Sequence, residues 1–168
     1  MADGQRSRRR ASDVTGPNEE LLIRVLTLAD YAVTPPDGKL YIAGGGIEQI
    51  LIPEIPGQLG PIYLAVRVRV PWSKTSEPLP FLVRALDADR EPVGPDPLLR
   101  GVAEVGRAPG QRPGDELGVN LVVPLGGFPV KEAGNMYFHV VVADETIGVL
   151  PMKVDRAPKG ARALGDSS

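Results

Sequence analysis

Prolines recur along the whole chain of 168 residues and divide it into short segments. The 18 prolines and 20 glycines make up 38 residues, which is about twice their usual share in globular proteins. A proline inside a helix costs roughly 3 kcal/mol, because it removes a backbone hydrogen bond and clashes with the preceding turn. This distribution excludes a helical bundle.

Short apolar segments lie between these breaks, and the clearest of them is 62–70. Its aliphatic residues alternate with a second set that includes Arg67 and Arg69. A period of two is typical of a strand that buries one face and leaves the other wetter. A similar alternation over 135–143 gives four residues one shared face: Met136, Phe138, Val140 and Val142.

Eight or nine short strands are predicted in all, over residues 21–30, 39–43, 47–52, 62–70, 81–86, 101–105, 116–123, 135–143 and 147–154. No amphipathic helix lies between them, so a doubly wound parallel sheet is excluded. We predict an all-β fold over residues 21–155, a single antiparallel β-sandwich of the immunoglobulin-like or jelly-roll-like kind. Residues 1–20 and 156–168 are polar and cannot offset their ordering entropy by burial, so both are predicted to be disordered tails.

The residue inventory also excludes many chemistries. The chain has no cysteine and a single histidine, His139, so a thiol nucleophile, a disulfide and a cysteine or histidine zinc site are excluded. His139 lies within a predicted strand, and no Gly-x-Ser-x-Gly segment accompanies it, so a serine hydrolase triad is not expected. We expect a protein that is not an enzyme and has no cofactor or metal ion; a hydrolase that uses two carboxylates is a weaker alternative.

Two local motifs have structural interpretations. Gly44-Gly45-Gly46 leads into a predicted strand, whereas a phosphate loop needs a helix N-terminus there, so we interpret the glycines as a bulge or wide turn. Asp87, Asp89 and Glu91 resemble a set of oxygen ligands for Ca²⁺. Segment 87–90 is, however, a typical turn between two strands, and we prefer that interpretation.

The charge pattern argues against a nucleic-acid partner. The net charge is −2, and residues 21–154 carry 12 Lys and Arg against 15 Asp and Glu, whereas such a partner requires a basic face. The basic run 8–10 precedes polar residues, so we expect no secretion signal, no membrane span and a cytoplasmic protein. The arginines are interpreted as part of a solubilising tail, with phosphorylation of Ser12 as an alternative.

Several segments together resemble a family of small, mainly actinobacterial, uncharacterised all-β proteins. They are 28–32 (Leu-Ala-Asp-Tyr-Ala), 37–46 (Asp-Gly-Lys-Leu-Tyr-Ile-Ala-Gly-Gly-Gly), 70–72, 86–89, 92–93 and 134–146. The resemblance covers about residues 22–154, and the basic N-terminal extension departs from it. It implies a single sandwich and contributes no catalytic residue.

Three residues stand out as binding candidates: Trp72, Arg67 and Arg69. Trp72 follows the clearest strand, where a tryptophan either caps the open end of a core or offers a ring to a ligand. Arg67 and Arg69 share a predicted sheet face that fits an acidic patch on a partner. The sequence does not indicate how the tyrosines lie relative to one another.

The leading hypothesis is therefore a non-catalytic interaction or structural module that binds another protein. Sheet edges near 39–42 or 147–154 would pair with a strand of that partner. The first alternative is a module that binds a small ligand or carbohydrate through Trp72 and the loop 73–80; a phage structural protein is a further one.

Overall fold

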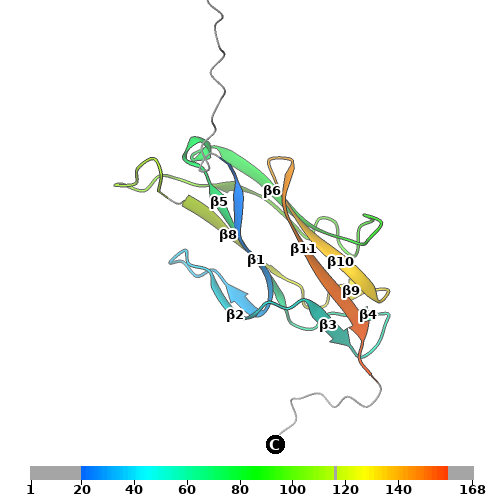
Figure 1. The fold of residues 1–168 in the computed structure, drawn as a ribbon. Coiled ribbons are helices and arrows are strands. Elements are labelled where there is room, and N and C mark those ends of the chain that lie inside the picture. Colours follow the sequence, from blue (N-terminus) through cyan, green and yellow to red (C-terminus); the bar gives the residue numbers. More distant parts are fainter. Residues whose placement is uncertain (1–19, 116, 159–168) are drawn as a thin grey trace, which may run out of the picture.

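The computed structural model describes residues 20–115 and 117–158, and this part of the chain is all-β (Figure 1). In chain order the strands are β1 (Leu22–Val33), β2 (Tyr41–Gly45), β3 (Gln49–Ile52), β4 (Gly57–Gln58), β5 (Tyr63–Val70), β6 (Pro78–Leu86), β7 (Leu99–Glu104), β8 (Leu117–Pro124), β9 (Pro129–Val130), β10 (Gly134–Val142) and β11 (Glu145–Arg156). One 3₁₀ helix, η1 (Trp72–Lys74), follows β5. The tails predicted at 1–20 and 156–168 lie largely outside the described residues.

The strands form three sheets. Sheet A has the order β2-β1-β5-β8, sheet B the order β3-β11-β10-β6-β7, and sheet C consists of β4 and β9. Sheets A and C are antiparallel throughout. In sheet B, however, β3 runs parallel to β11, so the prediction of a purely antiparallel fold was wrong at this pair. Segment 46–48 carries the chain from β2 in sheet A to β3 in sheet B, and this crossing allows a parallel pair without a hairpin.

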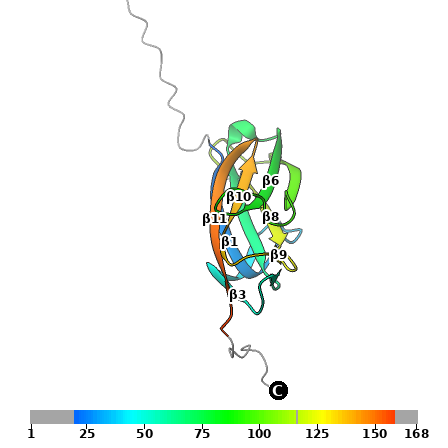
Figure 2. The same cartoon turned by 90° about the vertical axis from the view of Figure 1, so that its right-hand side faces the viewer.

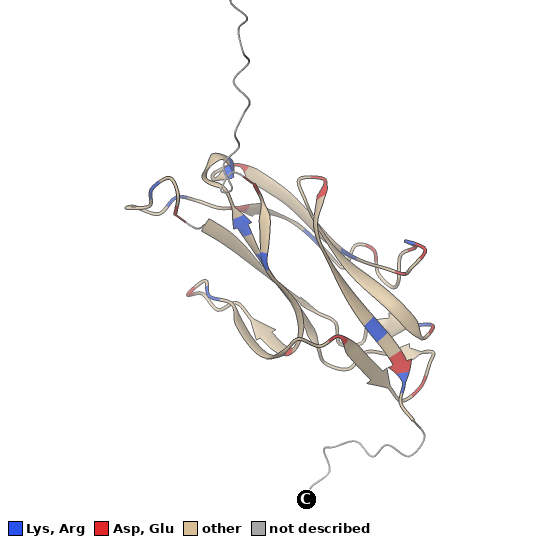
Figure 3. Ribbon diagram, viewed as in Figure 1, with Lys and Arg blue, Asp and Glu red and all other residues tan. Residues whose placement is uncertain are grey.

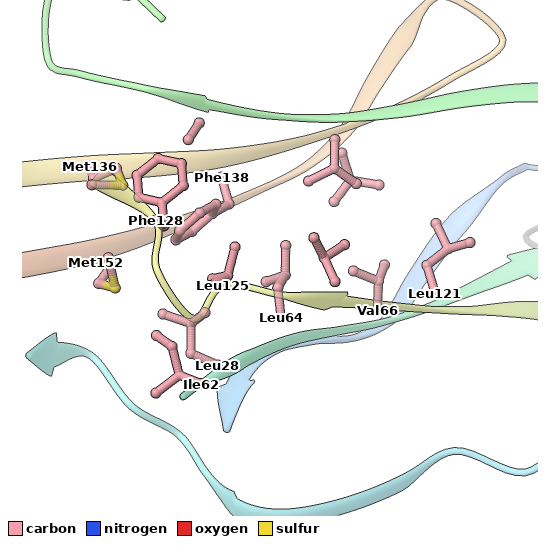
Figure 4. Close-up of a cluster of buried hydrophobic side chains, with 14 of the residues drawn as sticks. Leu28, Ile62, Leu64, Val66, Leu121, Leu125, Phe128, Met136, Phe138 and Met152 are labelled. Carbon is pink, nitrogen blue, oxygen red and sulfur yellow. The ribbon is translucent and has the colours of Figure 1, made fainter. Parts of the chain in front are cut away.

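The hydrophobic core draws its side chains from strands of both sheet A and sheet B, which Figures 1 and 2 show from two directions. Sheet A contributes Leu28, Leu64 and Val66, and Phe138 and Met152 come from sheet B (Figure 4). The predicted shared face of β10 is confirmed, since all four of its apolar residues are buried. Full burial of each such side chain contributes about 1.5–3 kcal/mol, which explains why the alternation persists along the strand.

Strand β5 was predicted to have one buried and one wetter face, and its second face is more buried than predicted. Its inward face is buried as expected, but Ala65 and Arg69 on the other face are also buried, at 0% and 7% exposure. The physical reason is its position: β1 and β8 flank β5 on both sides. The hairpin of β1 and β2 also bends over this outer face, since its loop reaches β8, where Asn120 Nδ2 donates a hydrogen bond to Gly38 O (2.8 Å).

Two sheet edges were predicted, and the structure confirms one of them only. Strand β2, which contains residues 41 and 42 of the predicted edge, is an edge strand of sheet A. Strand β11 pairs with β10 along its length and with β3 over Lys153–Arg156. Only its first part therefore lacks a second strand partner among the described residues, and the prediction of a free edge up to residue 154 was wrong. The small strands β4 and β9 were not predicted.

Candidate interaction site

Strand β2 presents an open backbone edge. Its five residues are all exposed, and among the described strands it pairs only with β1. Its sequence, Tyr-Ile-Ala-Gly-Gly, contains no proline and no charged residue (Figure 3). Natural proteins usually protect such edges with charge, proline or a covering segment. The edge of β2 carries neither a charged residue nor a proline.

The outer side of sheet A carries a group of residues that we call the tyrosine face: Tyr31, Tyr41, Tyr63, Arg67 and Asn120. On β5, Leu64 and Val66 point into the core, so Tyr63 and Arg67 point outward, and Asn120 lies opposite Arg67 on β8. The register of β1 with β5 and with β2 places Tyr31 and Tyr41 on the same side. The rings of Tyr31 and Tyr63 meet edge-on, with centroids 5.6 Å apart and planes at 72°. Tyr31 is 51% exposed and Tyr41 is 47% exposed, so two aromatic rings remain accessible beside the open edge.

A chain of polar contacts positions this face. Arg67 Nη1 donates to Asn120 Oδ1 (3.0 Å), and Asn120 Nδ2 donates to Gly38 O (2.8 Å). On the other side of the same loop, Tyr41 Oη donates to Asp37 Oδ2 (3.0 Å). Gly38 has φ +74°, a conformation that glycine adopts at little cost. The loop before β2 is thereby fixed to β8 at one end and to β2 at the other.

The structure separates the two candidate arginines. Arg69 is buried, and its Nη2 donates to Glu20 O (3.2 Å), so it holds the start of the described chain against β5. Arg67 is half-buried, and within the described part of the chain its side chain donates one hydrogen bond, to the neutral amide of Asn120. It forms no ion pair with any residue of the described ranges. Arg67 is therefore the arginine with hydrogen-bonding capacity toward a partner on the tyrosine face.

Trp72 lies apart from this face, in η1 beyond the end of β5. The guanidinium of Arg107 lies 4.3 Å from the centroid of its ring. Arg107 also donates from Nε to Thr75 Oγ1 (2.6 Å) and from Nη2 to Trp72 O (3.1 Å). The half-buried ring of Trp72 and the arginine stacked on it connect η1 to the loop after β7. The capping and the ligand-binding interpretations of Trp72 both stay predictions.

Two of the three consecutive glycines, Gly44 and Gly45, are the last residues of β2, and Gly46 directly follows the strand. Gly44 has φ +64°, and a Cβ at this position would overlap the carboxylate of Asp30. The amide of Gly46 donates to Leu28 O (3.0 Å). Strand β3, not a helix, follows. The register between β1 and β2 does not shift at the glycines, so the predicted bulge is not seen, and the glycines instead end β2 before the chain enters sheet B.

The acidic set at 87–91 forms the predicted turn. Asp87 Oδ1 accepts hydrogen bonds from the amides of Asp89 and Glu91, both at 2.9 Å. One carboxylate is thus used to fix the backbone. Within the described ranges, no group of three or more His, Cys, Asp or Glu residues is arranged to hold a metal ion.

His139 is a half-buried residue of the outer face of sheet B, as predicted for a sheet-face position. It lies opposite Arg84 on β6 and Val149 on β11. Burial lowers the pKa of His139, and the positive charges of Arg90 and Arg84 lower it further. The neutral imidazole is therefore favoured in the folded protein.

Sequence reasoning missed two residues that organise these sites. Arg107 stacks on a ring 35 positions away, and Asn120 connects Arg67 to a loop 82 positions away. Neither contact follows from a local pattern, because each joins segments that only the strand order brings together. The tyrosines were recognised individually, and register alone places three of them on one face.

Comparison with known protein families gives a match. Residues 24–155 match the model of a family of unknown function (DUF6941). The match runs from β1 to the end of β11 and so includes both main sheets. No curated protein matches the chain. Among the described residues, no helix is long and apolar enough to cross a membrane.

Proposed function

We propose that this chain, which belongs to the family of unknown function matched by residues 24–155 (DUF6941), is a non-catalytic protein-interaction module. An extended segment of its partner would add to β2 as a further strand of sheet A. The observation that carries the proposal is the open edge of β2, which is exposed in all five residues and bears no charge or proline.

The physical basis is the hydrogen-bonding capacity of the edge. Every second residue of an edge strand directs its N–H and C=O groups away from the sheet, where an added strand can pair with them. Main-chain pairing supplies affinity, and neighbouring side chains supply specificity. Ile42, at 37% exposure, and Tyr41 provide apolar surface beside this edge.

The tyrosine face suggests which segments would be selected. Arg67 has one neutral partner and no described ion pair, so a carboxylate near it would gain a charge-assisted hydrogen bond. Tyr31 and Tyr41 offer large rings that lose little conformational entropy on binding. We therefore expect an extended partner segment that carries an acidic residue and is otherwise apolar or aromatic.

We also infer that sheets A and B act as the two layers of one β-sandwich. Support comes from the buried side chains of both sheets, which pack into one cluster between them. In this arrangement the β1–β2 hairpin bends over the outer face of sheet A, and its loop is held against β8 by the hydrogen bond from Asn120 to Gly38 O. The topology includes a parallel pair, which distinguishes it from a simple immunoglobulin-like or jelly-roll-like order.

The test is affinity capture from a lysate of the native host with three full-length baits. They are the natural chain, Ile42→Lys on β2 and Leu51→Lys on the edge strand β3, where Leu51 is 53% exposed. A charge on an edge opposes strand addition. We expect a protein that the natural chain and Leu51→Lys retain equally and that Ile42→Lys loses at least about tenfold. Equal retention by Ile42→Lys would contradict the proposal, as would the absence of any retained protein.

A further inference from the structure

The hairpin of β1 and β2 extends beyond the rest of sheet A. Strand β1 pairs with β5 as far as Ala29, which lies opposite Tyr63. Among the described strands, residues 30–33 of β1 pair with β2 alone. We call residues 30–45 the arm: they comprise the end of β1, the loop 34–40 and β2. Two strands by themselves are only marginally stable, so the position of the arm depends on its contacts with other strands.

The base of the arm is held by packing. The rings of Tyr31 and Tyr63 meet there, with centroids 5.6 Å apart, and Ala32 is buried. All five residues of β2 are exposed, by contrast, and so is the loop segment 36–39. Burial therefore fixes the base of the arm and leaves its tip to polar contacts.

The tip of the arm is braced internally and fastened at one point. The two carboxylate oxygens of Asp37 accept hydrogen bonds from Lys39 N and Tyr41 Oη, both at 3.0 Å. Among the described residues, one hydrogen bond joins this tip to a strand outside the arm: Asn120 Nδ2 on β8 donates to Gly38 O (2.8 Å). The tip is therefore expected to move as one piece, with Asn120 as its attachment.

Arg67 determines which way the amide of Asn120 points. A guanidinium group has donors and no acceptor, so it must face the amide oxygen, as it does in the bond from Nη1 to Oδ1 (3.0 Å). The amide nitrogen is thereby directed to Gly38 O, which can only accept. A carboxylate at position 120 would still accept from Arg67, but it would turn an oxygen toward Gly38 O and could not donate to it.

We propose that Asn120 is a latch, which holds the arm over the outer face of sheet A and so positions the β2 edge for strand addition. The inference rests on the proposed function, which places the partner on β2. In the latched position the tip lies near Arg67, because Asn120 contacts both. One partner segment can then pair with β2 and bring its acidic residue to Arg67. In the unlatched position the β2 edge and Arg67 are apart, and binding has to bring them together first, which lowers the apparent affinity.

Pulsed electron paramagnetic resonance between two spin labels tests the latch in the free full-length chain. The natural chain has no cysteine, so Lys39→Cys in the tip and Val149→Cys on β11 give two defined label positions. We expect one narrow distribution of distances in this background and a second, broader component after Asn120→Asp. Loss of the hydrogen bond to Gly38 O should raise the ratio of unlatched to latched chains about fivefold. Asn135→Asp, the same change at an exposed position of β10, should leave the distribution narrow.

A second variant shows which of the two bonds of Asn120 holds the tip. Asn120→Ala loses both bonds, whereas Asn120→Asp keeps an acceptor for Arg67. The latch requires that both variants unlatch the arm to a similar extent. A narrow distribution for Asn120→Asp would overturn it, since Arg67 would then hold the tip. If Asn120→Asp melts early, Asn120→Ala is compared with Asn135→Ala, and equal distributions for these two would overturn the latch.

Affinity capture with the same variants separates the positioning role from the proposed function. Asn120→Asp should lower retention of the protein held by the natural chain about fivefold, while Asn135→Asp retains it fully. Full retention by Asn120→Asp, where Ile42→Lys loses that protein, would overturn the positioning role and leave strand addition to β2 standing. Retention by Ile42→Lys would contradict the proposed function instead, and the spin-label distances would still decide whether Asn120 is a latch.

Discussion

The two faces of the central strand β5 give a sharp test of the fold. Val66 is fully buried and lies between Leu26 on β1 and Leu121 on β8. Its neighbour Arg67 is half-buried on the opposite face. The same substitution, to aspartate, at these adjacent positions should therefore have very different consequences for stability.

The expected magnitudes follow from the environment of each residue. Truncating Val66 to alanine would remove two carbons worth about 0.8 kcal/mol each and leave a cavity, for a loss of about 2–3 kcal/mol. Val66→Asp adds a polar or charged group without a partner, which brings the loss to more than about 4 kcal/mol. Arg67→Asp removes one hydrogen bond at a partly solvated site, for which about 1 kcal/mol is expected.

Urea unfolding of the full-length chain, followed by circular dichroism, measures these differences. Trp72 is the only tryptophan and lies directly after β5, so its fluorescence gives an independent probe of the same transition. Because the total stability of a domain is typically about 5–15 kcal/mol, Val66→Asp should unfold most or all of the protein. Equal free energies of unfolding for the two aspartate variants would refute the assignment of the β5 faces.

Three further perturbations should have defined effects. Gly44→Ala should destabilise the fold by about 1–3 kcal/mol in urea unfolding, because a Cβ would overlap Asp30 at a positive φ. Arg107→Ala should cost about 1–2 kcal/mol and shift the emission of Trp72, since it removes the stacked cation and two hydrogen bonds; an unchanged spectrum would contradict the stacking. The lowered pKa of His139, from an ordinary 6.5, means that the unfolded chain binds its proton more readily. The free energy of unfolding should therefore fall as pH decreases through 6.5, and His139→Gln should remove that part of the slope.

Strict alternation made the strand positions predictable. β10 shows this most clearly: its four inward residues are apolar, its outward residues are mixed, and the predicted and observed faces coincide. For β5 the alternation identified the inward face, but it could not indicate that a hairpin from β1 and β2 covers part of the other. Whether a face is covered depends on the order of the strands in the sheet. The local periodicity of the sequence does not indicate that order.

Contacts between distant segments explain the remaining differences. β4 and β9 have two residues each, too few to establish a period of two. β3 pairs in parallel with a strand about 100 positions away, a choice that the sequence of either strand does not encode. The candidate site also depends on contacts between distant segments. Asn120 can contact both Arg67 and the loop before β2 because β8 lies beside β5 in the sheet.

Hydrogen exchange of the β2 amides tests strand addition most directly. The full-length chain is compared alone and bound to the protein captured from the native host, with peptide-resolved mass spectrometry. We expect the segment Tyr41–Gly45 to exchange markedly more slowly in the complex, since an added strand would accept hydrogen bonds from those of its amides that point away from β1. Amides of η1, remote from this edge, should be unchanged. Protection that appears elsewhere while β2 exchanges as fast as in the free chain would contradict an interaction through this edge.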